Sequence, residues 1–127
     1  MKISVMGTGY VGLVSGTCLA ERGHQVTCID IRSEVVQEIN AGRPPIHEIG
    51  LDNLLRSARD KGMLSATTDA KTAILDSDVT LICVGTPTVD GRMDMSQIVA
   101  AAKEIGSALA SKRGYHVVAV KSTVLPG

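Results

Sequence analysis

A glycine-rich segment near the start of the chain has the spacing of residues that hold phosphate groups. Residues 7–12 read GTGYVG and match the pattern GxGxxG. In that pattern the glycines permit a tight turn, close approach of the backbone to a pyrophosphate, and close packing of a helix on a strand. The N–H groups at the start of the following helix would face the phosphates. The pattern predicts a dinucleotide site with contacts from Gly7, Gly9, Tyr10, Val11 and Gly12.

A carboxylate follows this turn at the separation expected for a ribose contact. Asp30 ends an apolar segment at residues 25–30, about 20 residues after the glycines. There it would accept hydrogen bonds from the adenosine ribose hydroxyls and repel a 2′-phosphate, which favours NAD over NADP. Arg32 argues more weakly for NADP, because an arginine after this strand can pair with that phosphate. The alternative is a solvated side chain near a helix start.

Two later segments carry polar groups at the ends of apolar runs. Gly85, in the sequence VGTPT at residues 84–88, would let the backbone pass close to a cofactor. Ser122 and Thr123, in KSTVLPG at residues 121–127, add two hydroxyls. These hydroxyls could bond a nicotinamide ribose, a substrate oxygen or a catalytic water, and ordinary turn chemistry is the alternative for both segments.

The elements that must position these residues alternate as βαβ units on a parallel sheet. The sequence predicts an α/β fold with a Rossmann-type doubly wound parallel sheet in a single domain, residues 1–127. A loop is predicted at residues 85–94. The predicted strands are residues 3–6, 25–30, 64–67, 79–84 and 116–120, and the predicted helices are residues 11–22, 33–39, 51–61, 70–75 and 96–112.

Composition excludes several classes of function. Thirteen basic and thirteen acidic residues cancel, so bulk charge does not favour binding to nucleic acid or to an anionic membrane. No apolar run approaches the roughly 20 residues that span a bilayer. Cys18, Cys28 and Cys83 lack metal-ligand spacing and are expected to be reduced, buried thiols of a cytoplasmic protein. The three histidines are scattered, so no metal site is predicted.

Four segments together resemble the N-terminal domain of nucleotide-sugar 6-dehydrogenases, the UDP-glucose and GDP-mannose dehydrogenase family. They are residues 7–13, 45–51, 84–87 and 121–127. The resemblance implies oxidation of a sugar C6 hydroxyl to a carboxylate in two hydride transfers to NAD, through a cysteine nucleophile in a later part of the family's chain. It also implies that Asp30 binds the ribose, Thr86 lies near the nicotinamide, and Thr123 helps to hold a catalytic water.

The resemblance has departures and leaves alternatives. Val35 stands where the family often has a lysine that supports the ribose, and Ile49 replaces a proline of the family's loop. The chain is expected to be a fragment that lacks the central helix and the catalytic region, inactive alone and binding a nucleotide sugar only in the full-length enzyme. The sugar stays open, and an oligomer is possible. The alternatives are a stand-alone NAD-sensing module of the potassium-transport type, or a β-hydroxyacid-type dehydrogenase.

Overall fold

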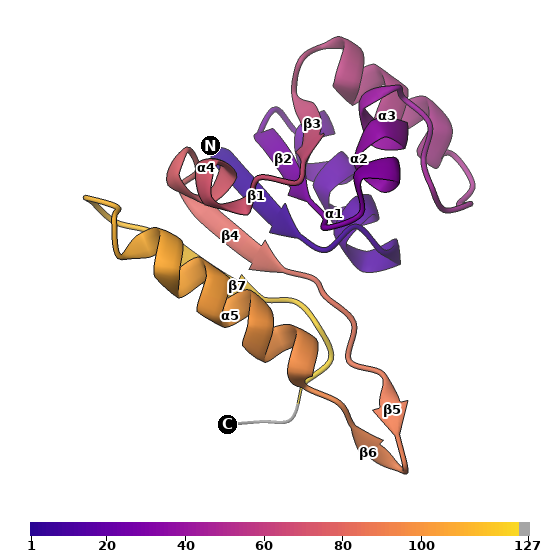
Figure 1. The fold of residues 1–127 in the computed structure, drawn as a ribbon. Helices are drawn as coiled ribbons and strands as arrows, with labels where there is room; N and C mark the ends of the chain where they lie inside the picture. Colours follow the sequence, from indigo (N-terminus) through magenta and orange to yellow (C-terminus); the bar gives the residue numbers. More distant parts are fainter. Residues whose placement is uncertain (125–127) are drawn as a thin grey trace.

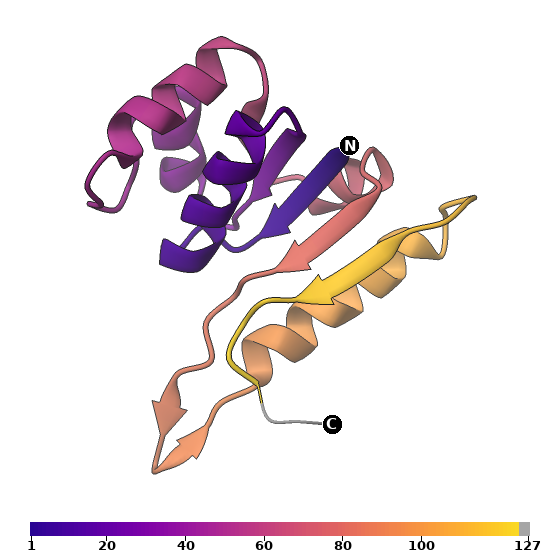
Figure 2. The ribbon, with the colours of Figure 1, turned by 180° about the vertical axis from the view of Figure 1, so that it is seen from behind.

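The computed structural model describes residues 1–124. Its centre is a five-stranded sheet in the order β3-β2-β1-β4-β7, in which all neighbouring strands are parallel (Figures 1 and 2). The predicted Rossmann-type parallel sheet is confirmed. Its strands are β1 (Lys2–Met6), β2 (Gln25–Ile29), β3 (Leu64–Thr67), β4 (Val79–Ile82) and β7 (Val117–Val120).

Within residues 1–124, five helices cover the two faces of this sheet. One core contains residues of α1, α2 and α3 with β1, β2 and β3, and a second contains residues of α4 and α5 with the other face (Figure 1). The predicted double winding is therefore present. The helices are α1 (Tyr10–Glu21), α2 (Ser33–Asn40), α3 (Leu51–Asp60), α4 (Ala70–Leu75) and α5 (Ser96–Leu109).

The two cores follow from the alternation of side chains along each strand. Val5 pairs with Cys28, and both are fully buried in the core under α1. The next residue, Met6, pairs with Ile29 on one side and Ile82 on the other, and all three belong to the core under α4 and α5. A one-residue shift of register would exchange the two sets, so the apolar pattern fixes the pairing.

The connections place a crevice between β1 and β4. From β1 the chain builds outward through β2 and β3, then returns to β4 on the other side of β1 and continues to β7. In such sheets the loops at the carboxyl ends of the two central strands diverge, and ligands bind in the space between them. The glycine turn follows β1, and the segment from Cys83 to Gly85 follows β4.

The region predicted as a loop at residues 85–94 contains a small hairpin. The strands β5 (Thr88–Val89) and β6 (Arg92–Met93) pair antiparallel and project from the carboxyl edge of the sheet (Figures 1 and 2). Asp90 and Gly91 have φ angles of 51° and 74°, which is the combination that a two-residue hairpin turn requires. The adjacent Asp90 and Gly91 are the feature of the sequence from which this hairpin turn could have been predicted.

Smaller differences concern ends of elements and one thiol. The predicted strand 79–84 ends at Ile82, and the predicted helix 96–112 ends at Leu109. Cys28 and Cys83 are buried as expected, but the expectation for Cys18 is wrong, because its side chain lies on the exposed side of α1. All three are free thiols. No helix within residues 1–124 is long and apolar enough to cross a membrane.

Candidate functional site

The glycine turn joins β1 to α1 and passes close to the end of β4. Gly7 has φ +100°, and its N–H donates to the carbonyl of Ile29 at 3.0 Å. A Cβ at Gly7 would lie 2.8 Å from the carbonyl oxygen of Cys83, and a Cβ at Gly12 would lie 1.9 Å from the carbonyl oxygen of Gly7. Both positions are therefore closed to any side chain by the protein's own backbone.

Gly9 differs from these two glycines. It precedes α1 in an extended conformation, with φ −72°, and apart from its chain neighbours no atom of residues 1–124 lies within 4 Å of the Cβ that another residue would place there. The first N–H groups of α1, which begins at Tyr10 directly after Gly9, have no carbonyl partner within the helix. An open backbone beside free N–H groups is the arrangement that lets a pyrophosphate approach, so the turn fits a dinucleotide.

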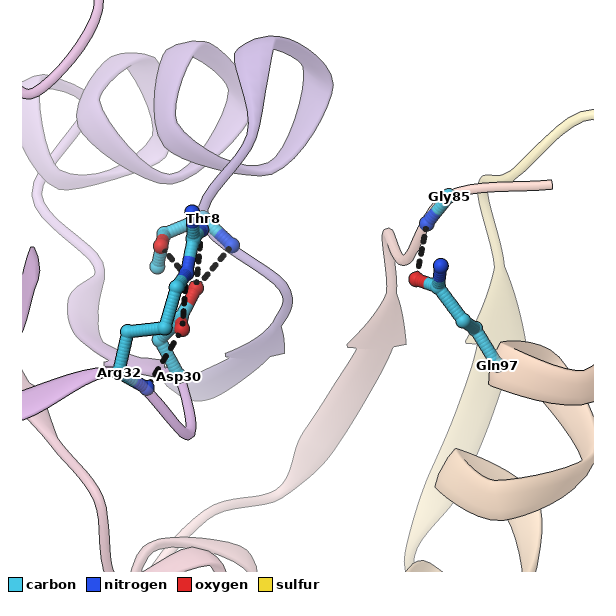
Figure 3. Close-up of polar contacts among 5 residues, drawn as sticks. All are labelled: Thr8, Asp30, Arg32, Gly85 and Gln97. Atoms are coloured by element: carbon cyan, nitrogen blue, oxygen red, sulfur yellow. Dashed lines mark hydrogen bonds and ion pairs between the residues drawn. The ribbon is translucent and has the colours of Figure 1, made fainter. Parts of the chain in front are cut away.

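Asp30 follows β2 and is held by its neighbours on several sides (Figure 3). Its Oδ1 accepts from the backbone N–H of Arg32 at 2.9 Å and from Arg32 Nε at 3.0 Å. Its Oδ2 accepts from Arg32 Nη2 at 3.1 Å, from the hydroxyl of Thr8, and from the N–H of Thr8 at 3.4 Å. The carboxylate is thus fixed between the glycine turn and the start of α2.

These contacts decide the charge of Asp30. The residue is 8% exposed, and burial alone raises the pKa of a carboxyl group. The hydrogen bonds from Arg32 and Thr8 and the charge of Arg32 outweigh burial and lower the pKa of Asp30 to about 2. Asp30 is therefore an anion at neutral pH and accepts hydrogen bonds without donating any.

The segment after β4 is tied to α5 and to the end of β7. The N–H of Gly85 donates to Gln97 Oε1 at 3.2 Å (Figure 3). The hydroxyl of Ser122 donates to the carbonyl of Val84 at 2.6 Å, and the N–H of Lys121 donates to the carbonyl of Ile82 at 2.8 Å. The proton of the Ser122 hydroxyl is therefore engaged by the backbone, and its lone pairs remain to accept a hydrogen bond.

The carboxyl ends of β1, β2, β4 and β7 border one cavity of about 700 Å³, within the range of small-molecule sites. Gly12, a predicted cofactor contact, does not line the cavity but packs against the carbonyl group of Gly7. Thr123 is on its wall, whereas Leu125, Pro126 and Gly127 of the same motif lie outside the described residues. The other predicted site residues all line the cavity, namely Gly7, Gly9, Tyr10, Val11, Asp30, Gly85, Thr86 and Ser122.

Two residues that the sequence did not single out organise this cavity. Thr8 is 1% exposed and orients Asp30 through its hydroxyl. Gln97 reaches from α5 to Gly85. The position of Thr8 between two glycines was the only available signal, and nothing in the sequence marked Gln97. Val35, in the place of the family's lysine, is 8% exposed and packs in the core under α2.

The thiol that lines the cavity is not activated for nucleophilic attack. Cys83 lines the wall, and burial raises its pKa. Burial, with the nearby Cys83 and Asp30, raises the pKa of Cys28 to about 12. Both groups stay protonated at neutral pH, and a thiol is a poor nucleophile compared with a thiolate. Among residues 1–124, no three His, Cys, Asp or Glu side chains are grouped to hold a metal.

Comparison with known proteins gives a family match over the whole chain. Residues 1–127 match the model of the UDP-glucose/GDP-mannose dehydrogenase family, NAD binding domain. The chain is 50% identical to a GDP-mannose 6-dehydrogenase of Pseudomonas aeruginosa and 47% identical to a UDP-glucose 6-dehydrogenase of Rhizobium meliloti, covering 100% of this chain in both cases. It spans 29% of the length of each of these relatives.

A solved structure shows the same fold. The crystal structure of a ternary complex of GDP-mannose dehydrogenase from Pseudomonas aeruginosa superposes with a TM-score of 0.98 at 50% identity, over 100% of this chain and 29% of that one. The family match gives no support to a stand-alone sensor of potassium transport.

Proposed function

The chain belongs to the UDP-glucose/GDP-mannose dehydrogenase family as its NAD-binding domain, and we propose that it serves an enzyme that oxidises the C6 hydroxyl of a nucleotide sugar to a carboxylate with two NAD. The observation that carries the proposal is the buried carboxylate of Asp30, which borders the same cavity as the glycine turn and the ends of β4 and β7. NAD supplies the chemistry when bound, because its nicotinamide ring accepts a hydride.

We assign the pyrophosphate to the glycine turn. Gly7 and Gly12 set the course of the backbone, and Gly9 leaves the space. Tyr10 and Val11, which line the cavity as the first residues of α1, would donate their N–H groups to the pyrophosphate. The dipole of α1 favours negative charge at this end of the helix. Asp30 then accepts hydrogen bonds from the adenosine ribose.

We assign the nicotinamide half of the cofactor to the other two strand ends. Gly85 and Thr86 border the cavity after β4, and Ser122 borders it after β7 while also holding Val84. Thr123 lies next to Ser122, and its hydroxyl would position a catalytic water, which makes it the catalytic residue that this chain contributes. The remaining chemistry needs a nucleophile from another part of the enzyme, because Cys28 and Cys83 are buried thiols with raised pKa values, and the exposed Cys18 does not line the cavity.

The substrate class in this proposal is a nucleotide sugar bound only in the full-length enzyme. Relatives that act on GDP-mannose and on UDP-glucose are similarly close, at 50% and 47% identity, so they support the class without choosing the sugar. Residues 1–127 alone would therefore bind NAD without turnover. A cytoplasmic location, supported by the three free thiols, and self-association are parts of the same proposal.

The experiment that tests the proposal is a calorimetric titration of the chain with NAD and NADP. We expect Asp30→Asn and Asp30→Ala to weaken NAD binding about 10- to 100-fold, because a charge-assisted pair of hydrogen bonds to the ribose is lost. NADP binding should not weaken to the same degree, since the repulsion of its 2′-phosphate is lost as well.

The matched control is Asp60→Asn, which removes an exposed carboxylate that pairs with Arg59 on α3. It should leave both titrations unchanged. Wild-type affinity for NAD in a folded Asp30 variant would refute the assigned role of Asp30. Equal affinity of the wild-type chain for NAD and NADP would refute the preference for NAD.

A further inference from the structure

The carboxylate of Asp30 has no free position for a ribose hydroxyl. A carboxylate offers about four lone-pair sites. Here it accepts from the N–H and the hydroxyl of Thr8, and from the backbone N–H, Nε and Nη2 of Arg32. A ribose that binds Asp30 must therefore displace one of these donors.

The donors differ in how easily they can leave. Thr8 is 1% exposed and belongs to the glycine turn, and the backbone N–H of Arg32 is fixed at the start of α2. The guanidinium is carried by a long side chain that is 55% exposed, against 6% for the side chain of Asp30. The side chain of Arg32 is the donor that can move into solvent without disturbing the backbone.

The guanidinium also has unused capacity on the cavity side. Arginine has five N–H donors, and Asp30 engages one on Nε and one on Nη2. Both residues line the cavity together with Ile31 and Thr68. The remaining N–H groups could bind an anion beside Asp30, and a planar guanidinium suits the oxygens of a phosphate.

We propose that Arg32 determines the selectivity between NAD and NADP at this site, by competing with the ribose of NAD for Asp30 and by pairing with the 2′-phosphate of NADP. The inference rests on the proposed function, because it assumes that Asp30 faces the adenosine ribose. With NAD, the guanidinium must release the carboxylate that the ribose needs. With NADP, it stays between two anions and screens their repulsion. Arg32 therefore narrows the preference for NAD that Asp30 alone would impose.

The test is calorimetric titration of the wild-type chain, Arg32→Ala and Arg32→Gln with NAD and with NADP. We expect both substitutions to tighten NAD binding a few-fold and to weaken NADP binding about tenfold. The ratio of the two dissociation constants should then shift at least about tenfold toward NAD. Arg32→Gln keeps much of the side chain's length and removes its charge, so it separates the charge from loss of packing.

Arg43→Ala is the matched control. Arg43 forms a similar two-bond pair with Glu38, with Nε–Oε2 at 2.8 Å and Nη2–Oε1 at 3.2 Å, at the end of α2. Its loss changes net charge by the same amount and should leave the ratio unchanged. A shift in the same direction with Arg43→Ala would mean that net charge, and not Arg32 itself, sets the selectivity.

Two outcomes distinguish an error in the role proposed for Arg32 from an error in the proposed NAD site on which that role rests. If Arg32→Ala and Arg32→Gln change NAD and NADP binding equally, or change neither, Arg32 does not set selectivity, while the NAD site stands. If the wild-type chain binds neither nucleotide, or Asp30→Asn leaves NAD binding intact, the assigned site fails and the inference fails with it. Thermal melting of each variant shows whether it is folded before it is titrated.

Discussion

The three glycines of the cofactor turn have different neighbours. Backbone atoms lie too close to Gly7 and Gly12 to admit a Cβ, whereas a Cβ at Gly9 would meet no atom of residues 1–124 within 4 Å other than those of its chain neighbours. The fold therefore requires glycine at two positions, and only a ligand can require it at the third. This difference separates effects on folding from effects on binding within one short motif.

We predict that Gly9→Ala weakens NAD binding by tenfold or more, about 1.4 kcal/mol, without lowering the melting temperature. Its extended backbone accepts alanine, but the added methyl group would occupy the approach to the pyrophosphate. Gly12→Ala should instead destabilise the fold by several kcal/mol or prevent folding, because backbone atoms must move apart, as in other overpacked sites. Thermal melting and calorimetric titration measure the two effects.

Gly106→Ala is the control for this pair. Gly106 lies inside α5 with open space at its Cβ, so alanine should stabilise the helix by about 0.5–1 kcal/mol and leave NAD binding as it was. Unchanged affinity in Gly9→Ala would show that the cofactor does not approach this part of the turn.

At the scale of elements, local pattern predicted most of the fold. The strand Leu64–Thr67 and the helix Ala70–Leu75 have the predicted bounds, because turn residues flank each apolar segment. The candidate site was also largely predictable, since parallel strands bring their carboxyl ends to one edge. Most predicted site residues line the same cavity for that reason.

The parts of the site that the sequence did not predict depend mostly on contacts between segments far apart in the chain. Gln97 approaches Gly85 only after α5 has packed on the sheet. Thr8 orients Asp30 across a separation of 22 residues. Neither residue type is specific to such a role, because threonine and glutamine also occur on exposed helices and in turns. The hydrogen bonds from the Arg32 side chain to both oxygens of Asp30 likewise depend on side-chain geometry that the sequence does not specify.

One such long-range contact protects the open edge of the sheet. Asn40, the last residue of α2, uses its amide like a neighbouring strand: Nδ2 donates to the carbonyl of Ala66 at 2.9 Å, and Oδ1 accepts from the N–H of Ala66 at 2.8 Å. The strand β3 pairs on its other side with β2. An unpaired strand edge is a template for association with another chain. The Asn40 amide engages two of the backbone groups that this edge would otherwise expose.

We predict that Asn40→Ala lowers the free energy of unfolding by about 1–2 kcal/mol, because both hydrogen bonds to β3 are lost. Urea denaturation measures the change. The control is Asn53→Ala on the exposed side of α3, which should be neutral or slightly stabilising, since alanine is the better helix former. An equal loss in both variants would mean that the amide of Asn40 adds nothing to the sheet.

Considered as a whole, the molecule has a second polar centre, which lies toward the amino ends of β4 and β7, while the cavity lies at their carboxyl ends. Ser4 on β1 lies 2.7 Å from the hydroxyl of Thr80 on β4, and that hydroxyl lies 2.8 Å from Nε2 of His116. Lys112 Nζ lies 2.9 Å from Nδ1 of the same ring and also donates to the carbonyl of Ser77. This network joins the central strands to the segment between α5 and β7.

The surroundings of His116 favour its neutral form. An ammonium group only donates, so in the neutral ring Nδ1 accepts from Lys112 and Nε2 carries the proton toward Thr80. Nδ1 also lies 3.1 Å from the carbonyl oxygen of Ser77, which a protonated ring would use as its acceptor. Burial, followed by the charge of Lys112, lowers the pKa of His116, and the carbonyl of Ser77 and the charge of Asp78 oppose this only in part. Protonation would place two cations next to each other where β7 meets β4.

The consequence is a pH dependence of the whole fold that differs from that of the cofactor site. In the unfolded chain histidine has a pKa of about 6.5, above that of folded His116. At a pH between the unfolded and the folded pKa of His116, the unfolded state binds more protons than the folded state. The contribution of His116 to the free energy of unfolding is therefore fully present above this pH window and is lost as the pH falls through it. Asp30 has a folded pKa of about 2. Its contribution is lost only between the unfolded value of about 3.9 and that folded value.

We predict that the free energy of unfolding, measured in urea, falls between pH 7.5 and pH 5, and that His116→Gln removes part of this fall. The variant should also be about 1 kcal/mol less stable at pH 7.5, because its amide cannot reproduce the hydrogen bonds of the ring. His47→Gln, in an exposed loop, is the control and should follow the wild type at every pH. If His116→Gln kept the wild-type slope, the acid sensitivity would have to arise elsewhere, and the junction of β7 with β4 would not be its origin.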